Sequence, residues 1–211
     1  MIKQSVSRNS LLLGLFAVVT TGLVVFTANV TKAKIAEEKQ QALRRNLLEV
    51  MPKERLNNSL LKSQFSIEPS PLLGTKEAQD GYLAKLDQDP TGVILQAVAP
   101  EGYGGSINLL VGITDNGEVS GVRVIPPHFE TPGLGDAIEI QKSPWINSFV
   151  GKSLANTSEK QWQVKKDGGS FDAFAGATIT PRAVVDAVHK SLLYFDQNKS
   201  QLLYGHSEKA K

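Results

Sequence analysis

The fold is decided by the stretch Ile107-Asn-Leu-Leu-Val-Gly-Ile-Thr-Asp-Asn-Gly-Glu-Val-Ser-Gly-Val-Arg-Val124. Residues 107–114 form a short apolar run, and residues 119–124 contain three valines with glycine and polar residues between them. Between the two runs lies Asp115-Asn-Gly117, and an Asn-Gly pair tolerates the positive φ angles of tight hairpin turns. The stretch therefore predicts two antiparallel strands joined by a short turn.

Further elements follow on both sides of this hairpin. Residues 82–86, 93–99 and 161–165 each predict one more strand, and residues 144–149 predict a short helix. A loop rich in proline and glycine, residues 126–135, follows the hairpin. The sequence thus predicts an α+β domain with a small, mainly antiparallel sheet and flanking helices.

The stretch Asp172-Ala-Phe-Ala-Gly-Ala-Thr178-Ile-Thr-Pro181 predicts a turn that leads into the last helix. Pro181 suits a first helical position, Thr180 suits the N-cap, and residues 182–195 have helical periodicity. A helix start has unpaired N–H groups and a partial positive charge, which stabilise a phosphate. The stretch therefore indicates a threonine oxygen beside an anion site, with an ordinary helix start as the alternative.

The N-terminal part predicts a membrane anchor. Residues 11–30 are almost wholly apolar, and twenty helical residues span about 30 Å, the thickness of the bilayer hydrocarbon. A cleavable signal peptide is the alternative, but the run is longer than usual and no clear Ala-x-Ala site follows it. The basic residues that flank the run favour a cytoplasmic domain, although long domains often translocate regardless of charge.

These patterns divide the chain into five segments. We expect a short tail at 1–10, a transmembrane helix at 11–30, a helical stalk and connecting segment at 31–90, a domain at 91–200 and a polar tail at 201–211. The helical stalk should end before Pro52.

Composition excludes several classes of function. The formal net charge is only +2, which does not indicate nucleic-acid binding. The absence of cysteine excludes disulfides, thiolate metal sites and cysteine-ligated clusters. The histidines at positions 128, 189 and 206 lack metal-ligand spacing, and we expect surface or packing roles for them. The sequence has no Walker loop and no Gly-x-Gly-x-x-Gly after a predicted strand, so we do not expect this chain to bind NAD itself.

Three segments, 100–105, 131–136 and 172–178, together resemble the FMN-binding domain of membrane flavoproteins. Within that group the chain resembles the family of G subunits of Rnf ion-translocating oxidoreductase complexes. The C subunit of sodium-translocating NADH:quinone reductases is similar but usually longer, and remains an alternative. The resemblance covers most of the chain.

The resemblance implies which residues carry the cofactor. FMN would be linked through its phosphate to the hydroxyl of Thr178, with Asp172, Gly176 and Ala177 in the motif read by a flavin transferase that uses FAD. The motif usually has serine or threonine where this chain has Ala175. The hydroxyl that makes the link is still present, so we expect this change to be tolerated.

The resemblance also implies that a second segment contacts the flavin. This segment is Glu130-Thr131-Pro-Gly133-Leu134-Gly135, whose glycines permit backbone contact with a flat ring; a rigid turn without ligand is the alternative. Tyr103 and Trp145 are candidates for stacking on the ring, or else core or rim aromatics. Three bases, Lys165, Lys166 and Arg182, either assist the phosphate or are solvated.

By resemblance, the chain is an electron carrier without catalytic or metal-binding residues of its own. It would relay electrons within a complex that exchanges them between ferredoxin and NAD and moves ions. Its partners would be other membrane subunits and the transferase. It would be single-pass in the bacterial inner membrane, with a periplasmic C-terminal domain. A bitopic scaffold without redox function and a noncovalent flavin protein are the alternatives.

Overall fold

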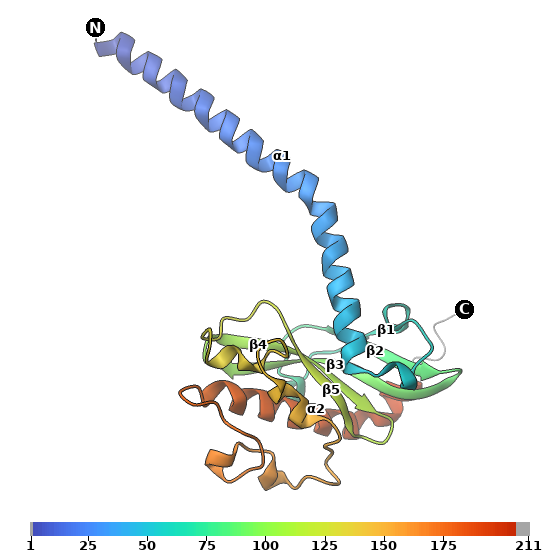
Figure 1. Cartoon of the computed structure of the whole chain (residues 1–211). Helices are drawn as coiled ribbons and strands as arrows, with labels where there is room; N and C mark the ends of the chain where they lie inside the picture. Colours follow the sequence, from blue (N-terminus) through green and yellow to red (C-terminus); the bar gives the residue numbers. More distant parts are fainter. Residues whose placement is uncertain (1, 206–211) are drawn as a thin grey trace. The chain divides into compact units, whose positions relative to one another are not determined.

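The described part of the chain begins with one long helix, α1, Ile2–Val50 (Figure 1). The computed structural model describes residues 2–205, with side chains from residue 6 onward. Contacts divide the chain into two units, one ending at Leu43 and the other beginning at Arg44. Helix α1 therefore contributes residues to both units.

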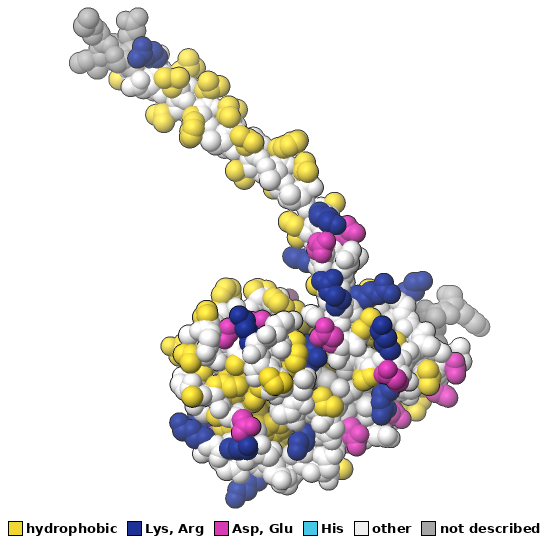
Figure 2. All heavy atoms as spheres, in the orientation of Figure 1, with side chains coloured by type: hydrophobic (Ala, Val, Ile, Leu, Met, Phe, Trp, Pro, Cys, Tyr) yellow, Lys and Arg dark blue, Asp and Glu magenta, His cyan; other side chains and the backbone are white. Residues whose placement is uncertain are grey.

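In the first unit, the apolar part of α1 presents its side chains outward, as Figure 2 shows by the hydrophobic colour along this segment. The hydroxyls of Thr20, Thr27 and Thr31 each donate to a carbonyl one turn earlier, at 2.8 Å. Hydrogen bonds of this kind satisfy a hydroxyl without any need for water. Within the described residues, α1 is the one helix long and apolar enough to cross a membrane. The expected apolar helix is present and continues as a helix up to Val50.

The second unit is built on a five-stranded sheet with strand order β1-β2-β3-β4-β5. Each strand pairs antiparallel with the next one along the chain. The strands are β1 Gln64–Ile67, β2 Gln79–Leu86, β3 Asp89–Gly102, β4 Gly105–Thr114 and β5 Val119–Ile125. The first two strands lie within residues 31–90, the segment expected to hold stalk and connections. The α+β prediction is confirmed.

The hairpin predicted from residues 107–124 is confirmed as β4 and β5. The amide of Gly117 donates to the Thr114 carbonyl at 2.9 Å and closes the turn. Gly117 has a φ of +83°, a conformation that favours glycine. The turn residues therefore act as the sequence predicts.

Helix α2, Ile179–Tyr204, packs against β3 and β4. Residues at odd positions of both strands are buried in one core with the apolar stripe of α2, because alternate strand residues share a face. The strand residues are Val93, Leu95, Ala97, Ala99, Ile107, Leu109, Val111 and Ile113, and the helix residues are Val184, Val188, Leu192 and Phe195. The predicted helical stripe is confirmed.

The end of α1 packs on the sheet at a pair of glycines. Gly112 and Gly121 lie opposite each other in the β4–β5 register. A Cβ at Gly121 would lie 2.8 Å from the Val50 carbonyl oxygen, and one at Gly112 would lie 2.6 Å from a Val50 methyl carbon. Ser120 Oγ donates to that carbonyl at 2.8 Å. The two glycines thus form a socket that Val50 fills.

The strand predicted at residues 161–165 is absent. Short 3-10 helices occupy Glu159–Gln161 and Lys165–Asp167, and Val164 makes an isolated bridge with Phe171. The Trp162 ring packs 5.4 Å from the Phe171 ring and 5.2 Å from the His189 ring, and its side chain is buried. The apolar residues of this segment therefore pack into an aromatic cluster and leave no continuous strand. The helix predicted at 144–149 is confirmed as a 3-10 helix.

Candidate functional site

The two segments that the sequence singles out, 130–135 and 172–178, meet at one pocket. The pocket has a volume of about 340 Å³, within the range of small-molecule sites. It is lined by Tyr103, Glu130, Thr131, Leu134, Gly135, Gly176, Ala177, Thr178, Ile179 and Thr180. These residues come from the β3–β4 turn, the loop after β5 and the start of α2.

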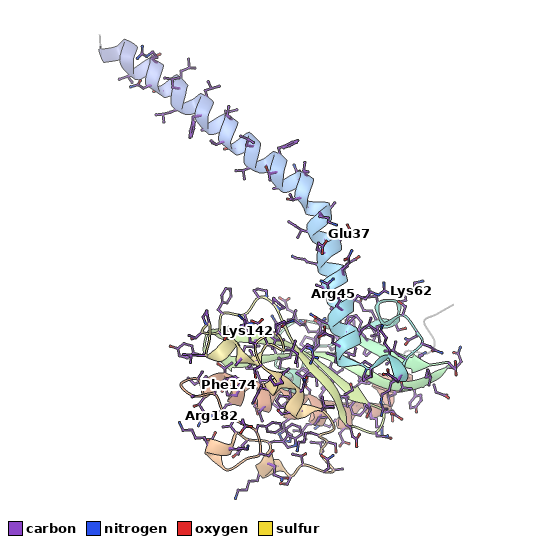
Figure 3. All side chains as sticks on the ribbon, in the orientation of Figure 1. Glu37, Arg45, Lys62, Lys142, Phe174 and Arg182 are labelled. Atoms are coloured by element: carbon purple, nitrogen blue, oxygen red, sulfur yellow. The ribbon has the colours of Figure 1, made fainter. Side chains whose placement is uncertain are left out.

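The turn before α2 is held from behind by Trp145. The Trp145 indole N–H donates to the Asp172 carbonyl at 2.8 Å, and its ring packs edge-on against Phe174 at 5.0 Å. Figure 3 labels Phe174 in this turn. The Trp145 side chain is buried and does not line the pocket. Trp145 was expected either to stack on the flavin or to be a core or rim aromatic, and the structure supports a core role. Tyr103, the other candidate, is exposed at the pocket.

Gly176 lets the chain turn sharply into the helix. Its φ is +78°, and the Ala177 amide donates to the Phe174 carbonyl at 3.2 Å across the turn. A Cβ at Gly176 would lie 3.7 Å from Leu134, so the two motif segments face each other closely at this point. The turn delivers Thr178 to the pocket.

The start of α2 differs from the prediction. The helix begins at Ile179, and Thr178 takes the N-cap position, so Thr180 and Pro181 lie inside the first turn. Pro181 fits there because the first helical residues have no intrahelical partner for their N–H groups. Thr180 is fully buried, because its hydroxyl donates to the Glu130 carboxylate and draws the first turn inward.

Thr178 and Thr180 therefore present their hydroxyls differently. Thr178 is partly exposed, and its hydroxyl makes no hydrogen bond to any residue that the structure describes. It lies at a helix start, where unpaired N–H groups and the helix dipole favour an anion. Between the two threonines, only Thr178 has an accessible and unengaged oxygen.

The loop 130–135 is held by a single carbonyl. The Thr131 carbonyl accepts from the amides of Leu134, Gly135 and Asp136 at 3.1, 3.0 and 3.3 Å. Gly133 sits at the outside of this turn with a φ of +76° and does not line the pocket. Leu134 is 42% exposed and presents an apolar side chain at the pocket, as a flat ring would require.

Glu130 ties the three segments together under the pocket. Its Oε1 accepts from the Gly104 amide at 3.0 Å, and its Oε2 accepts from the Thr180 hydroxyl. The side chain is only 5% exposed. A Cβ at Gly135 would lie 2.8 Å from Oε2, so the glycine makes room for the carboxylate. Glu130 thus shapes the wall of the pocket.

Several other candidates lie away from the pocket. The Asp172 carboxylate is exposed and pairs with Lys165 at 2.6 Å. Arg182, labelled in Figure 3, donates to Asp167 at 2.5 and 2.6 Å, and this hydrogen bonding lowers the pKa of that carboxyl. Lys165 and Arg182 are thus engaged elsewhere, and neither they nor Lys166 line the pocket.

The histidines have packing roles, as far as the structure describes them. His128 Nε2 lies 2.8 Å from Glu139 Oε1, and the His128 side chain is 8% exposed, so of the two expected roles the structure supports packing. His189 stacks on Trp162. His206 lies outside the described residues.

Ile179 and Thr180 line the pocket although the sequence did not mark them as site residues. A helix start placed two residues earlier would have included them, because the first turn faces the pocket. The helix start was predicted too late because Thr180-Pro181 has the pattern of an N-cap followed by a first helical proline.

Comparison with known proteins defines the class. Residues 102–193 match the FMN-binding domain family, and residues 1–50 match the RnfG N-terminal region. The chain is thus a flavin-binding protein with an N-terminal apolar helix. The residues present suit FMN, since an unengaged hydroxyl at a helix start meets apolar side chains at one pocket.

The full length of the chain identifies the family. It is 53% identical over 201 residues to the G subunit of the ion-translocating oxidoreductase complex of Pseudomonas aeruginosa (strain UCBPP-PA14), covering 95% of this chain and 94% of that one. It is 45% identical to the G subunit of Shewanella piezotolerans, covering 96% and 95%. It is 43% identical to that of Aliivibrio fischeri (strain MJ11), covering 94% of each. The chain belongs to the family of G subunits of ion-translocating oxidoreductase complexes.

Proposed function

We propose that this chain carries FMN as a phosphoester on Thr178 and relays electrons within the complex, with its second unit on the periplasmic side of the inner membrane. The observation that carries the proposal is the Thr178 hydroxyl, which is unengaged and accessible in the pocket shared by both motif segments. Membership of the family supports flavin binding and other subunits as partners.

The linkage would form by phosphoryl transfer from FAD. The Thr178 oxygen attacks the phosphorus on the flavin side of the pyrophosphate and loses its proton, the bond to the second phosphate breaks, and AMP leaves. A flavin transferase supplies the catalytic groups for this step. The chain supplies a hydroxyl that need not break an internal hydrogen bond, whereas the Thr180 hydroxyl would have to leave the Glu130 carboxylate.

The residues of the pocket have separate roles in holding the product. The N–H groups at the start of α2 stabilise the remaining phosphate charge. Leu134, Ile179 and Tyr103 provide exposed apolar surface for the ring. The bound flavin supplies the electron transfer, and the protein holds and tunes it.

Asp172 would contact the transferase and not the flavin. Its carboxylate is exposed, points to Lys165 and lies outside the pocket, although it belongs to the motif. An exposed side chain six residues before Thr178 is available to a docked enzyme. Gly176 and Ala177 would complete this recognition motif by giving the enzyme a compact turn at the acceptor oxygen.

A denaturing gel and an intact mass test the linkage. The full-length chain, produced with its flavin transferase, should remain fluorescent after denaturation and show the mass increment of one esterified FMN. Peptide fragmentation should place that increment on Thr178. A dark gel from yellow native protein would indicate noncovalent flavin, and colourless protein would favour the scaffold function.

Single cysteines test the orientation, because the native chain has none. Asn116→Cys lies in an exposed turn of the second unit, and Asn9→Cys lies before the apolar segment. In intact spheroplasts a membrane-impermeant maleimide should label the Asn116→Cys protein and leave the Asn9→Cys protein unlabelled. The reverse pattern would place the domain in the cytoplasm.

A further inference from the structure

The carboxylate of Glu130 is a fixed charge in the wall of the pocket. Both of its oxygens are engaged, one by the Gly104 amide at 3.0 Å and the other by the Thr180 hydroxyl. Glycines enclose it on two sides, since a Cβ at Gly102 would lie 2.7 Å from Oε1 and one at Gly135 would lie 2.8 Å from Oε2. The two hydrogen bonds therefore hold the carboxylate in the space that the glycines leave.

This charge has no cationic partner among the residues that the structure describes. Nearby acids have other partners, since Glu139 lies against His128 and Asp136 pairs with Lys142. The donors to Glu130 are a backbone amide and a neutral hydroxyl, which suit a carboxylate because it only accepts hydrogen bonds. The positive end of α2 offsets only part of a full charge.

Glu130 lines the same pocket as Thr178, and the exposed side chains of Tyr103, Leu134 and Ile179 add apolar surface to it. Charges interact more strongly where apolar groups exclude water. Two-electron reduction of a flavin near neutral pH takes up one proton and so adds one negative charge to the ring. A fixed carboxylate in the wall therefore opposes reduction of a flavin held at this pocket.

Resting on the proposed linkage at Thr178, we infer that Glu130 is a positioning and tuning residue that lowers the reduction potential of the flavin. The carboxylate acts in two ways. Its hydrogen bonds hold Thr180 and the β3–β4 turn in place, and its charge makes the pocket less favourable for the reduced cofactor. The first role affects folding, whereas the second is measured only by the potential.

The test is the midpoint potential of the full-length flavinylated chain in detergent, titrated with dithionite and redox dyes. Glu130→Gln keeps the size of the side chain and removes its charge, so the potential should rise. Glu139→Gln removes a carboxylate paired with His128 and outside the pocket lining, so its potential should stay near that of the wild type. Glu130→Asp keeps the charge and should restore most of the lowering.

A flavinylated Glu130→Gln protein with an unchanged or lowered potential overturns the inference. The melting temperature shows whether that variant folds. If it does not, a positive charge is introduced into the pocket instead, at Thr131, whose carbonyl holds the loop. Thr131→Lys should then raise the potential relative to Thr131→Gln, and equal potentials would overturn the inference. Failure of the linkage itself is distinct, because the wild-type protein would then lack covalent flavin.

Discussion

Two of the places where glycines permit close approach in the second unit have different results. At the socket, Gly112 and Gly121 admit Val50, and the chain fills the space that they leave. At the pocket, Gly102 and Gly135 admit the Glu130 carboxylate, and a cavity of about 340 Å³ remains above it with Thr178 at its edge. The difference separates a packing contact from a binding site, because only the second leaves polar groups facing open space.

The largest effect should come from removing the acceptor oxygen at the pocket. Thr178→Val should abolish covalent flavin, seen as loss of fluorescence in a denaturing gel. Thr178→Ser keeps a hydroxyl and should retain the signal. Thr180 should not replace Thr178, since its hydroxyl is buried and bonded to Glu130. A Thr178→Val protein that stays fluorescent would show that another residue carries the cofactor.

Filling the socket should be the most damaging change to stability. The side chain of Gly121→Val would meet the Val50 backbone, with its Cβ 2.8 Å from the carbonyl oxygen and 2.9 Å from the Cα. Overpacking of this kind costs about 3 kcal/mol. Urea unfolding of the full-length chain in detergent measures this loss.

The folded fraction of Gly121→Val should still accept flavin, because the socket residues do not line the pocket. A Gly121→Val protein with wild-type stability would mean that Val50 is not seated on the two glycines of the socket. Loss of flavin from protein that remains folded would show that socket and pocket are coupled.

A smaller effect on stability is expected from changing Trp145, which supports the turn before α2. Trp145→Phe keeps an aromatic ring but removes the N–H that donates to the Asp172 carbonyl at 2.8 Å. Losing one such hydrogen bond should cost about 1 kcal/mol. Flavinylation followed over time should also become slower, because the turn that presents Thr178 is held less firmly. Equal rates would show that Trp145 serves the core alone.

The smallest effect should be a pH dependence from His189, which is remote from both regions. Burial lowers the pKa of His189, and the nearby Asp186 and Glu159 oppose that shift in part. The unfolded chain therefore binds a proton more readily than the folded one between the two pKa values. Stability should fall as the pH drops below about 6.5, the ordinary value, towards the folded pKa.

His189→Gln provides the matched control for this dependence. Unfolding curves for both proteins between pH 5 and about 8 cover the range over which an ordinary histidine titrates. The glutamine variant should show a shallower decrease of unfolding free energy towards acid pH. Parallel curves would assign the dependence to another group.

Local patterns predicted much of the fold correctly. The Asn-Gly turn between two β-rich runs identified the β4–β5 hairpin, and the spacing of Val184, Val188 and Leu192 identified the buried face of α2. The prediction failed at residues 161–165, where a strand-like run packs into an aromatic cluster instead. Strand formation depends on a partner edge, and no local pattern specifies that partner.

The sequence by itself determined the features that depend on neighbouring residues: the apolar segment at 11–30, the hairpin turn, and the glycine turn that precedes a threonine and a helix. Only the tertiary structure decided which threonine is accessible. Glu130 is 50 residues from Thr180 along the chain, and its carboxylate engages the Thr180 hydroxyl, whereas the Thr178 hydroxyl at the N-cap stays unengaged. A contact between such distant residues forms only when the sheet and α2 bring them together, so no local pattern could have revealed it.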